Sequence, residues 1–110
     1  MESSSLDVIR GTLDLLILKT LSWQPMHGYA VSQLIKEQTD SALLVEEGAL
    51  YPALYRMEAK GWIESTWGAS ENNRRAKYYS LTKAGRKYLQ AEEANWERLS
   101  SAIGLVLRTA

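Results

Sequence analysis

Apolar residues recur along this chain with a helical period toward both ends and with a strand-like period in one central stretch. Residues 6–21 carry an apolar stripe so wide that several elements, or a second copy of the chain, are needed to cover it. The stripe consists of Leu6, Ile9, Leu13, Leu16, Ile17 and Leu21, and is widened by Leu15 and Leu18. A second helix is predicted to open at His27 and to end near Gln38, with buried candidates Tyr29, Val31, Leu34 and Ile35.

A short helix followed by a two-stranded hairpin is predicted in the middle of the chain. Over residues 47–60 the apolar positions Leu50, Ala53, Leu54 and Met57 keep helical spacing, and Gly61 then favours a left-handed cap that ends the helix. Residues 62–67 and 76–81 are rich in aromatic and other apolar side chains, so both are predicted strands. They enclose a polar turn, GASENNRR, and residues 43–45 are expected to form a brief third strand.

The last predicted helix is long. It begins after the N-cap candidate Thr82 and covers residues 83–107. Its seam repeats at spacings of three and four residues, with one acidic interruption, and consists of Leu89, Glu92, Trp96, Leu99, Ile103 and Val106. Because so small a domain cannot bury the whole stripe, we expect this helix to pair with its counterpart in a second copy rather than to fold back on its own core.

Composition limits the classes of protein to consider. The chain has 110 residues, of which 45% are hydrophobic and 24% charged, as expected for one folded domain. It has no cysteine, no cationic leader before an apolar run and no apolar stretch long enough to cross a bilayer, so a cytoplasmic protein is expected. The one histidine, His27, is expected to be structural. Without a paired nucleophile and base we expect no enzyme, and we expect neither a metal nor a cofactor.

The charge is unevenly distributed along the chain. The net charge is zero, whereas nucleic-acid-binding domains are usually basic. Residues 1–47 hold seven acidic and three basic residues, but residues 71–87 hold six basic residues and one acidic residue. Since salt screens charges beyond about 8 Å, a local basic cluster matters more to a phosphate than the total charge does. The cluster is interleaved with Tyr78 and Tyr79 on the predicted hairpin, which favours phosphate binding over a merely solvated surface.

A small helix beside a basic hairpin suits duplex DNA, because the helix can enter the major groove while the hairpin contacts the backbone. If Leu54 and Met57 face the core, the opposite face of helix 47–60 carries small residues, tyrosines and Arg56. Arg56 is predicted to recognise guanine through hydrogen bonds to its base edge. For Tyr51, packing and a DNA contact are both open. The predicted DNA-binding residues are Tyr29, Gly48, Ala49, Tyr51, Pro52, Tyr55, Arg56, Asn73, Arg74, Arg75 and Lys77, with Asn72 beside them.

The two arginines of the hairpin turn are expected to act differently. A narrow A·T minor groove attracts an inserted arginine, so one of Arg74 and Arg75 is expected to read DNA shape while the other clamps the backbone. The sequence leaves open which arginine does which. Lys77 is expected to contact phosphate.

The order of these parts, together with four motifs, resembles the winged helix-turn-helix regulators of the PadR family. The motifs are GTLDLLILKTL at 11–21, PMHGYAVSQLI at 25–35, EGALYPALYRMEAKGWI at 47–63 and RRAKYYSLTKAGRKYL at 74–89. The resemblance implies a mainly α (α+β) fold, with a three-helix core and two-stranded wing over residues 1–81 and a dimerisation helix over residues 82–110. It also implies a bacterial, cytoplasmic, DNA-binding regulator, usually a repressor and often released by a small molecule. A winged helix used only for protein contacts is the alternative.

A homodimer would place two copies of helix 47–60 about 34 Å apart, one turn of duplex, and would bind an inverted repeat. The predicted dimerisation residues are Leu13, Ile17, Leu89, Trp96, Leu99, Ile103 and Val106. Trp96 is expected to fill this contact. Alternatively, the Trp96 side chains of two copies would form a flat apolar slot for a planar effector, with Glu92 selecting a cation.

Overall fold

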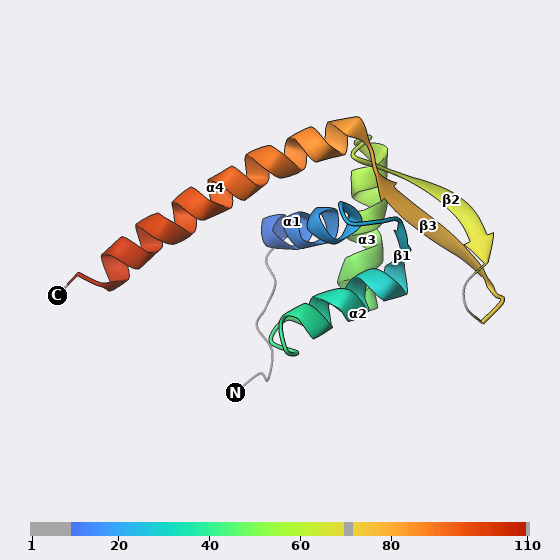
Figure 1. Ribbon diagram of the computed structural model, residues 1–110, viewed down its shortest axis with the longest axis horizontal. Helices are drawn as coiled ribbons and strands as arrows, with labels where there is room; N and C mark the ends of the chain where they lie inside the picture. The colour runs from blue at the N-terminus through green and yellow to red at the C-terminus, as the bar shows by residue number, and fades with distance from the viewer. Residues whose placement is uncertain (1–9, 70–71, 110) are drawn as a thin grey trace.

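The computed structural model describes residues 10–69 and 72–109, and over these residues the chain forms four helices and a three-stranded antiparallel sheet (Figure 1). In chain order the elements are α1 (Arg10–Leu21), β1 (Met26–His27), α2 (Gly28–Gln38), α3 (Glu47–Ala59), β2 (Ile63–Ala69), β3 (Arg75–Leu81) and α4 (Lys83–Leu107). The predicted fold, a three-helix core with a two-stranded wing and a long last helix, is confirmed. The predicted start of the first helix, residues 6–9, lies outside the described residues.

The sheet differs from the prediction in its third strand. β2 and β3 form the wing, with Ile63 opposite Leu81 at its base and Ala69 opposite Arg75 at its far end. The expected strand at residues 43–45 is wrong: the third strand is β1, which pairs Met26 with Tyr79 on the other edge of β3. A two-residue strand has too few positions to show a period of two, so the sequence pattern does not reveal it.

The core lies where α1, α3 and the base of the wing meet. Its most deeply buried side chains include Ile17, Leu18, Leu50, Leu54, Met57 and Ile63. Three residues predicted to form the dimer contact belong to this core instead: Leu13, Ile17 and Leu89 are 5%, 0% and 5% exposed within a single chain. That part of the prediction is wrong. Because α1 packs against α2, α3, β3 and α4, elements of its own chain already cover these positions.

The junction between α3, the wing and α4 is fixed by backbone contacts. Gly61 adopts φ +80°, so the predicted left-handed end of α3 is confirmed. Thr82 caps α4 by accepting a hydrogen bond from the Gly85 amide at 3.0 Å, while its hydroxyl lies 2.6 Å from the Gly61 carbonyl oxygen. Gly85 packs so closely that an added Cβ would lie 2.0 Å from the Trp62 carbonyl oxygen. The start of α4 is therefore locked onto the end of α3.

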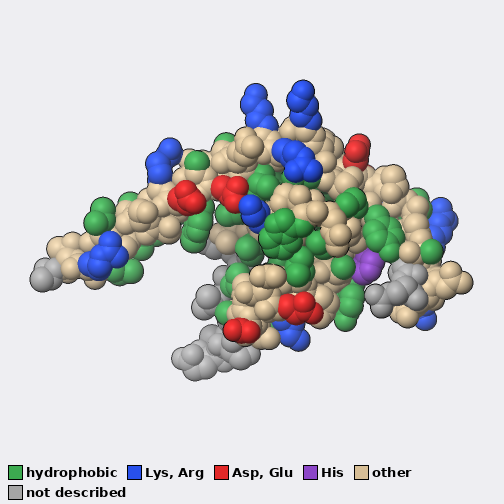
Figure 2. Space-filling model, in the orientation of Figure 1, with side chains coloured by type: hydrophobic (Ala, Val, Ile, Leu, Met, Phe, Trp, Pro, Cys, Tyr) green, Lys and Arg blue, Asp and Glu red, His purple; other side chains and the backbone are tan. Residues whose placement is uncertain are grey.

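The second half of α4 leaves the body of the molecule as an arm (Figure 1). An ion pair between Lys19 and Glu93, 2.9 Å long, ties α1 to the middle of α4. Beyond Glu93 most side chains are exposed, and Figure 2 shows hydrophobic side chains along this arm. They include Trp96, Leu99, Ile103, Leu105, Val106 and Leu107. Among the described residues no helix is both long and apolar enough to span a membrane.

Candidate nucleic-acid interface

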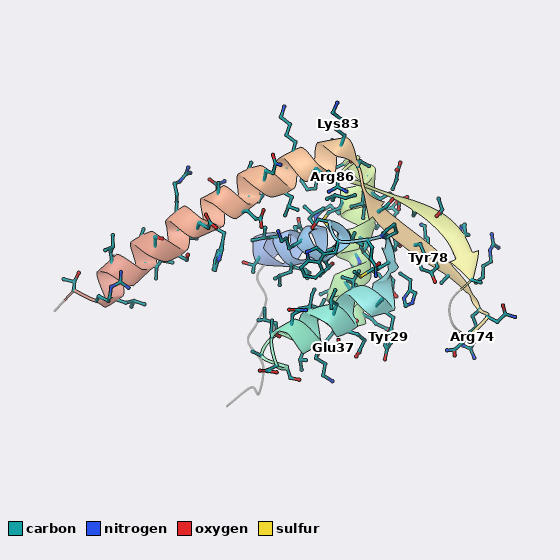
Figure 3. All side chains as sticks on the ribbon, in the orientation of Figure 1. Tyr29, Glu37, Arg74, Tyr78, Lys83 and Arg86 are labelled. Atoms are coloured by element: carbon teal, nitrogen blue, oxygen red, sulfur yellow. The ribbon has the colours of Figure 1, made fainter. Side chains whose placement is uncertain are left out.

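An open groove of about 970 Å³ lies between the start of α2, the first half of α3 and the wing. Its lining includes Met26, His27, Gly28, Tyr29, Gln33, Glu37, Tyr51, Trp67, Asn72, Arg74, Arg75, Lys77 and Tyr79. Five of the predicted DNA-binding residues thus meet in one concavity, although they come from three separate parts of the chain. Figure 3 shows Tyr29 at the start of α2 and Arg74 at the tip of the wing, on the same side of the molecule.

The floor of the groove is built by a close crossing of α2 and α3. The ring of Tyr51 lies over Gly28, where an added Cβ would be 2.8 Å from the Tyr51 hydroxyl oxygen, so glycine is what allows the helices to approach here. Partial burial raises the pKa of Tyr51, and Glu47 one turn earlier raises it further. The hydroxyl therefore stays protonated at neutral pH and can donate a hydrogen bond.

The start of α2 is capped by His27. Its Nδ1 accepts a hydrogen bond from the Ala30 amide at 3.1 Å, and its ring lies edge-on to Tyr78 with centroids 5.4 Å apart. The predicted structural role of His27 is confirmed. Tyr29 lines the groove and is 62% exposed, so the prediction that it is buried is wrong, and its contact with DNA stays a prediction.

One face of the wing forms the wall of the groove. Side chains on a strand alternate between faces, so Arg75 and Lys77 share a face with the buried Tyr79. The Arg75 guanidinium lies 4.7 Å from the centroid of the Trp67 ring. The Lys77 ammonium lies 3.6 Å from a carboxylate oxygen of Glu58, a half-exposed pair that contributes little to stability.

The turn of the wing places Asn73 in the left-handed region, with φ 59°. Asparagine tolerates this conformation better than most side chains, so Asn73 shapes the chain directly before the two arginines. Its predicted contact with DNA stays a prediction. Residues 70–71, which belong to the same turn, lie outside the described part of the chain.

Small residues lie on the exposed surface of α3 over its first turns, next to the exposed Glu47. Gly48, Ala49 and Pro52 are exposed, and nothing lies within 4 Å of a Cβ added at Gly48. Tyr55 is 77% exposed. This surface matches the predicted face and leaves room for a groove of DNA to approach the helix closely.

Arg56 does not lie where the sequence pattern placed it. Its guanidinium turns back toward α1 and lies 2.5 Å from a carboxylate oxygen of Asp14, with the two side chains only 24% and 12% exposed. The prediction that Arg56 lies exposed on the outer face of α3 is therefore wrong, and its contact with guanine stays a prediction. Asp14 stands 42 residues earlier, so the helical period of α3 could not reveal this partner.

Sequence reasoning missed several residues that line the groove, above all Trp67, which is 58% exposed. A signal was present: Ile63, Ser65 and Trp67 alternate along one predicted strand, so a buried Ile63 places Trp67 on the inner face. Gln33 lies one helical turn after Tyr29 and joins the lining in the same way.

The two residues predicted for the effector pocket do not line this groove. Trp96 is 47% exposed on α4, and Glu92 is partly exposed one turn earlier. Neither lines the groove or the smaller hollow next to it, whose lining includes Trp67, Gly68, Ala69, Asn73 and Arg75. In the described ranges, no three histidine, aspartate or glutamate side chains come together as they would to hold a metal ion.

Comparison with known proteins supplies independent evidence. The model of the transcriptional regulator PadR-like family matches residues 17–91. A transcriptional regulator from Clostridium thermocellum is 36% identical, with a TM-score of 0.81 over 90% of this chain and 96% of that one. A PadR-like regulator from Bacillus cereus is 30% identical, with a TM-score of 0.79 over 92% and 96% of the two chains. An uncharacterized protein from Lysinibacillus sphaericus is 33% identical over 92% of this chain and 93% of its own length.

Proposed function

The chain belongs to the PadR-like family of transcriptional regulators, and from that premise we propose that it represses transcription as a homodimer bound to an inverted-repeat operator. The first turns of α3 enter the major groove, and the wing contacts the backbone and the adjacent minor groove. The observation that carries this proposal is the groove itself, in which two exposed or half-exposed tyrosines face three wing cations.

The chemistry of the side chains indicates which of them contact phosphate and which contact bases. Tyr29 and Tyr51 can donate phenolic hydrogen bonds to phosphate, which fixes the orientation of the protein without reading sequence. Since Arg56 is engaged with Asp14, base contacts fall to the small surface of α3 and to Tyr55. Apolar contacts of this kind suit the methyl group of thymine. Lys77 and the wing arginines supply the charge that makes affinity depend on salt.

Selection of bound sequences from a random duplex pool tests the DNA-binding part of the proposal. The purified full chain should enrich an inverted repeat whose half-site centres lie about 34 Å apart. An Arg74→Ala/Arg75→Ala double variant, which removes two exposed wing charges, is the matched control and should enrich it far less. Enrichment of a single half-site would overturn the dimeric mode, and no enrichment at low salt would overturn the DNA-binding mode proposed here.

The dimer is proposed to form through the arm of α4. Trp96, Leu99, Ile103 and Val106 are all at least 45% exposed in the single chain, and they share one heptad seam. Pairing two such seams buries apolar surface that is otherwise in contact with water. Analytical ultracentrifugation at micromolar concentration should give the mass of two chains, and a single-chain mass would overturn this proposal.

Repression is the proposed output, because a dimer seated on an operator excludes other proteins from the same DNA. A reporter gene whose promoter overlaps the selected inverted repeat should be expressed less when the protein is co-produced. Higher expression would identify an activator instead.

An effector is proposed to bind between the two arms, where Trp96 of each copy would flank a planar ligand and Glu92 would favour a cation. A panel of flat cationic dyes should quench the tryptophan fluorescence of the wild type and not that of Trp96→Phe. Equal quenching of both proteins, or none in either, would leave Trp96 as a packing residue of the dimer.

A further inference from the structure

Trp67 makes a contact in the wing that distinguishes the two arginines of the turn. It is 58% exposed, and it lines both the main groove and the smaller hollow beside it. The guanidinium of Arg75 stacks on its ring, 4.7 Å from the centroid. An arginine stacked on an aromatic face keeps its N–H donors free at the edge of the guanidinium plane.

The strand register explains why this pair forms. Trp67 lies directly opposite Lys77, so Arg75, two residues away on the same face, is its diagonal neighbour across the ladder. The backbone of Arg75 is itself held in the ladder, where it pairs with Ala69. Both the backbone and the side chain of Arg75 are therefore positioned before any partner arrives.

On the opposite face of the wing, Tyr78 contacts the end of β2. The hydroxyl of Tyr78 donates a hydrogen bond to the Ala69 carbonyl oxygen at 3.0 Å, and its ring packs over Gly68, where an added Cβ would lie 3.2 Å away. This contact holds the end of β2, and with it the strand that carries Trp67.

Arg74 is placed differently. It precedes β3, outside the ladder, and follows the left-handed Asn73 in the turn. Among residues 10–69 and 72–109, three cations lie over aromatic rings, namely Lys60, Arg75 and Lys77. Arg74 makes no such contact within these residues. Its exposed side chain keeps its rotamer freedom until DNA binds.

We infer that Trp67 is a positioning residue that presents the Arg75 guanidinium edge-on to a narrow, A·T-rich minor groove, while Arg74 clamps the backbone. The inference rests on the proposed function. A narrow minor groove has an enhanced negative potential that attracts arginine. Trp67 lowers the ordering cost of binding, because Arg75 loses its rotamer freedom in the free protein rather than on the DNA.

Affinity and salt dependence together separate this role from an ordinary phosphate contact. In fluorescence anisotropy with the selected operator, Trp67→Ala should weaken binding about 3- to 10-fold, the cost of ordering one long side chain. It should leave the slope of log affinity against log salt unchanged, because no charge is removed. Arg75→Ala should weaken binding and also lower that slope by about 0.9. Trp67→Phe, which keeps an aromatic face, should bind nearly as the wild type does.

Arg74 provides the matched control in a double-variant cycle. Adding Trp67→Ala to Arg75→Ala should cost nothing further, whereas adding it to Arg74→Ala should cost the same factor as in the wild type. Replacing A·T pairs under the wing by G·C pairs should weaken the wild type and Arg74→Ala, and should not affect Arg75→Ala.

The failures can be told apart. A wild-type protein that binds no duplex overturns the proposed function and this inference with it. If the wild type binds DNA, two results overturn the inference alone. One is that Trp67→Ala binds as tightly as the wild type. The other is that Trp67→Ala lowers affinity by the same factor in the Arg74→Ala and Arg75→Ala backgrounds. Equal melting temperatures of the wild type and Trp67→Phe establish that the wing is intact in the conservative variant.

Discussion

Replacing Arg56 with methionine tests whether this arginine serves the fold rather than the DNA. Its guanidinium is paired with Asp14 at 2.5 Å, across the interface between α3 and α1. Methionine keeps most of the length of the side chain and removes its charge, so the variant loses the Arg56–Asp14 ion pair in a site that is mostly shielded from water.

The loss of stability expected in Arg56→Met lies between the cost of breaking an exposed ion pair and the cost of breaking a fully buried one. Breaking an exposed pair costs about 0–1 kcal/mol, and removing one partner of a buried pair costs about 3–5 kcal/mol. The two side chains are 24% and 12% exposed, so we expect a loss of about 2–3 kcal/mol in the free energy of unfolding. For a domain of this size that corresponds to a fall in melting temperature of roughly 8–20 °C.

The assay is urea unfolding followed by circular dichroism, at one fixed protein concentration because a dimer's apparent stability depends on concentration. Arg74→Met, at an exposed arginine of the wing, is the matched control and should not change stability. An Asp14→Leu/Arg56→Met double variant should recover much of the loss, since apolar replacement of both partners also removes the cost of shielding the carboxylate from water. Wild-type stability of Arg56→Met, together with an altered base preference in the selected operators, would refute this reasoning and restore Arg56 as a base reader.

Three further predictions address the junction, the arm and the response to pH. Gly85→Ala should lower the free energy of unfolding by about 1–3 kcal/mol, because the new Cβ would lie 2.0 Å from the Trp62 carbonyl oxygen. Gly48→Ala is the control: nothing lies within 4 Å of its new Cβ, so it should raise the free energy of unfolding by about 0.5–1 kcal/mol in the same urea assay. Ile103→Glu should sediment as a single chain with an unchanged circular dichroism spectrum, since Ile103 is 45% exposed within one chain; a persisting dimer would exclude the arm as the contact. Burial is the main cause that raises the pKa of Tyr79 above its usual 10.0, so the folded state favours the neutral phenol. Stability should therefore be retained at neutral pH and lost as the pH rises past about 10, and Tyr79→Phe should flatten that loss in melting curves recorded across alkaline pH.

The sequence predicted the local structure well because local chemistry encodes it. Gly61 ends α3 since a positive φ is easy for glycine, and Thr82 opens α4 since its hydroxyl can accept from the third amide that follows. The apolar spacing of α3 correctly identified its buried face, and the basic turn between two strands correctly indicated a wing with an exposed cationic tip. The motifs added the family, which the comparisons confirm.

Only the tertiary structure decided how each long or apolar side chain is used. A periodic pattern says that a stripe must be covered, but not by what: Leu13 and Leu89 are covered within the chain, whereas Trp96 is left exposed. A long flexible cation on the edge of a helix can turn to either side, and the choice for Arg56 depends on Asp14, which is remote in sequence. The stacking of Arg75 on Trp67 likewise depends on strand register, which pairing between distant residues sets.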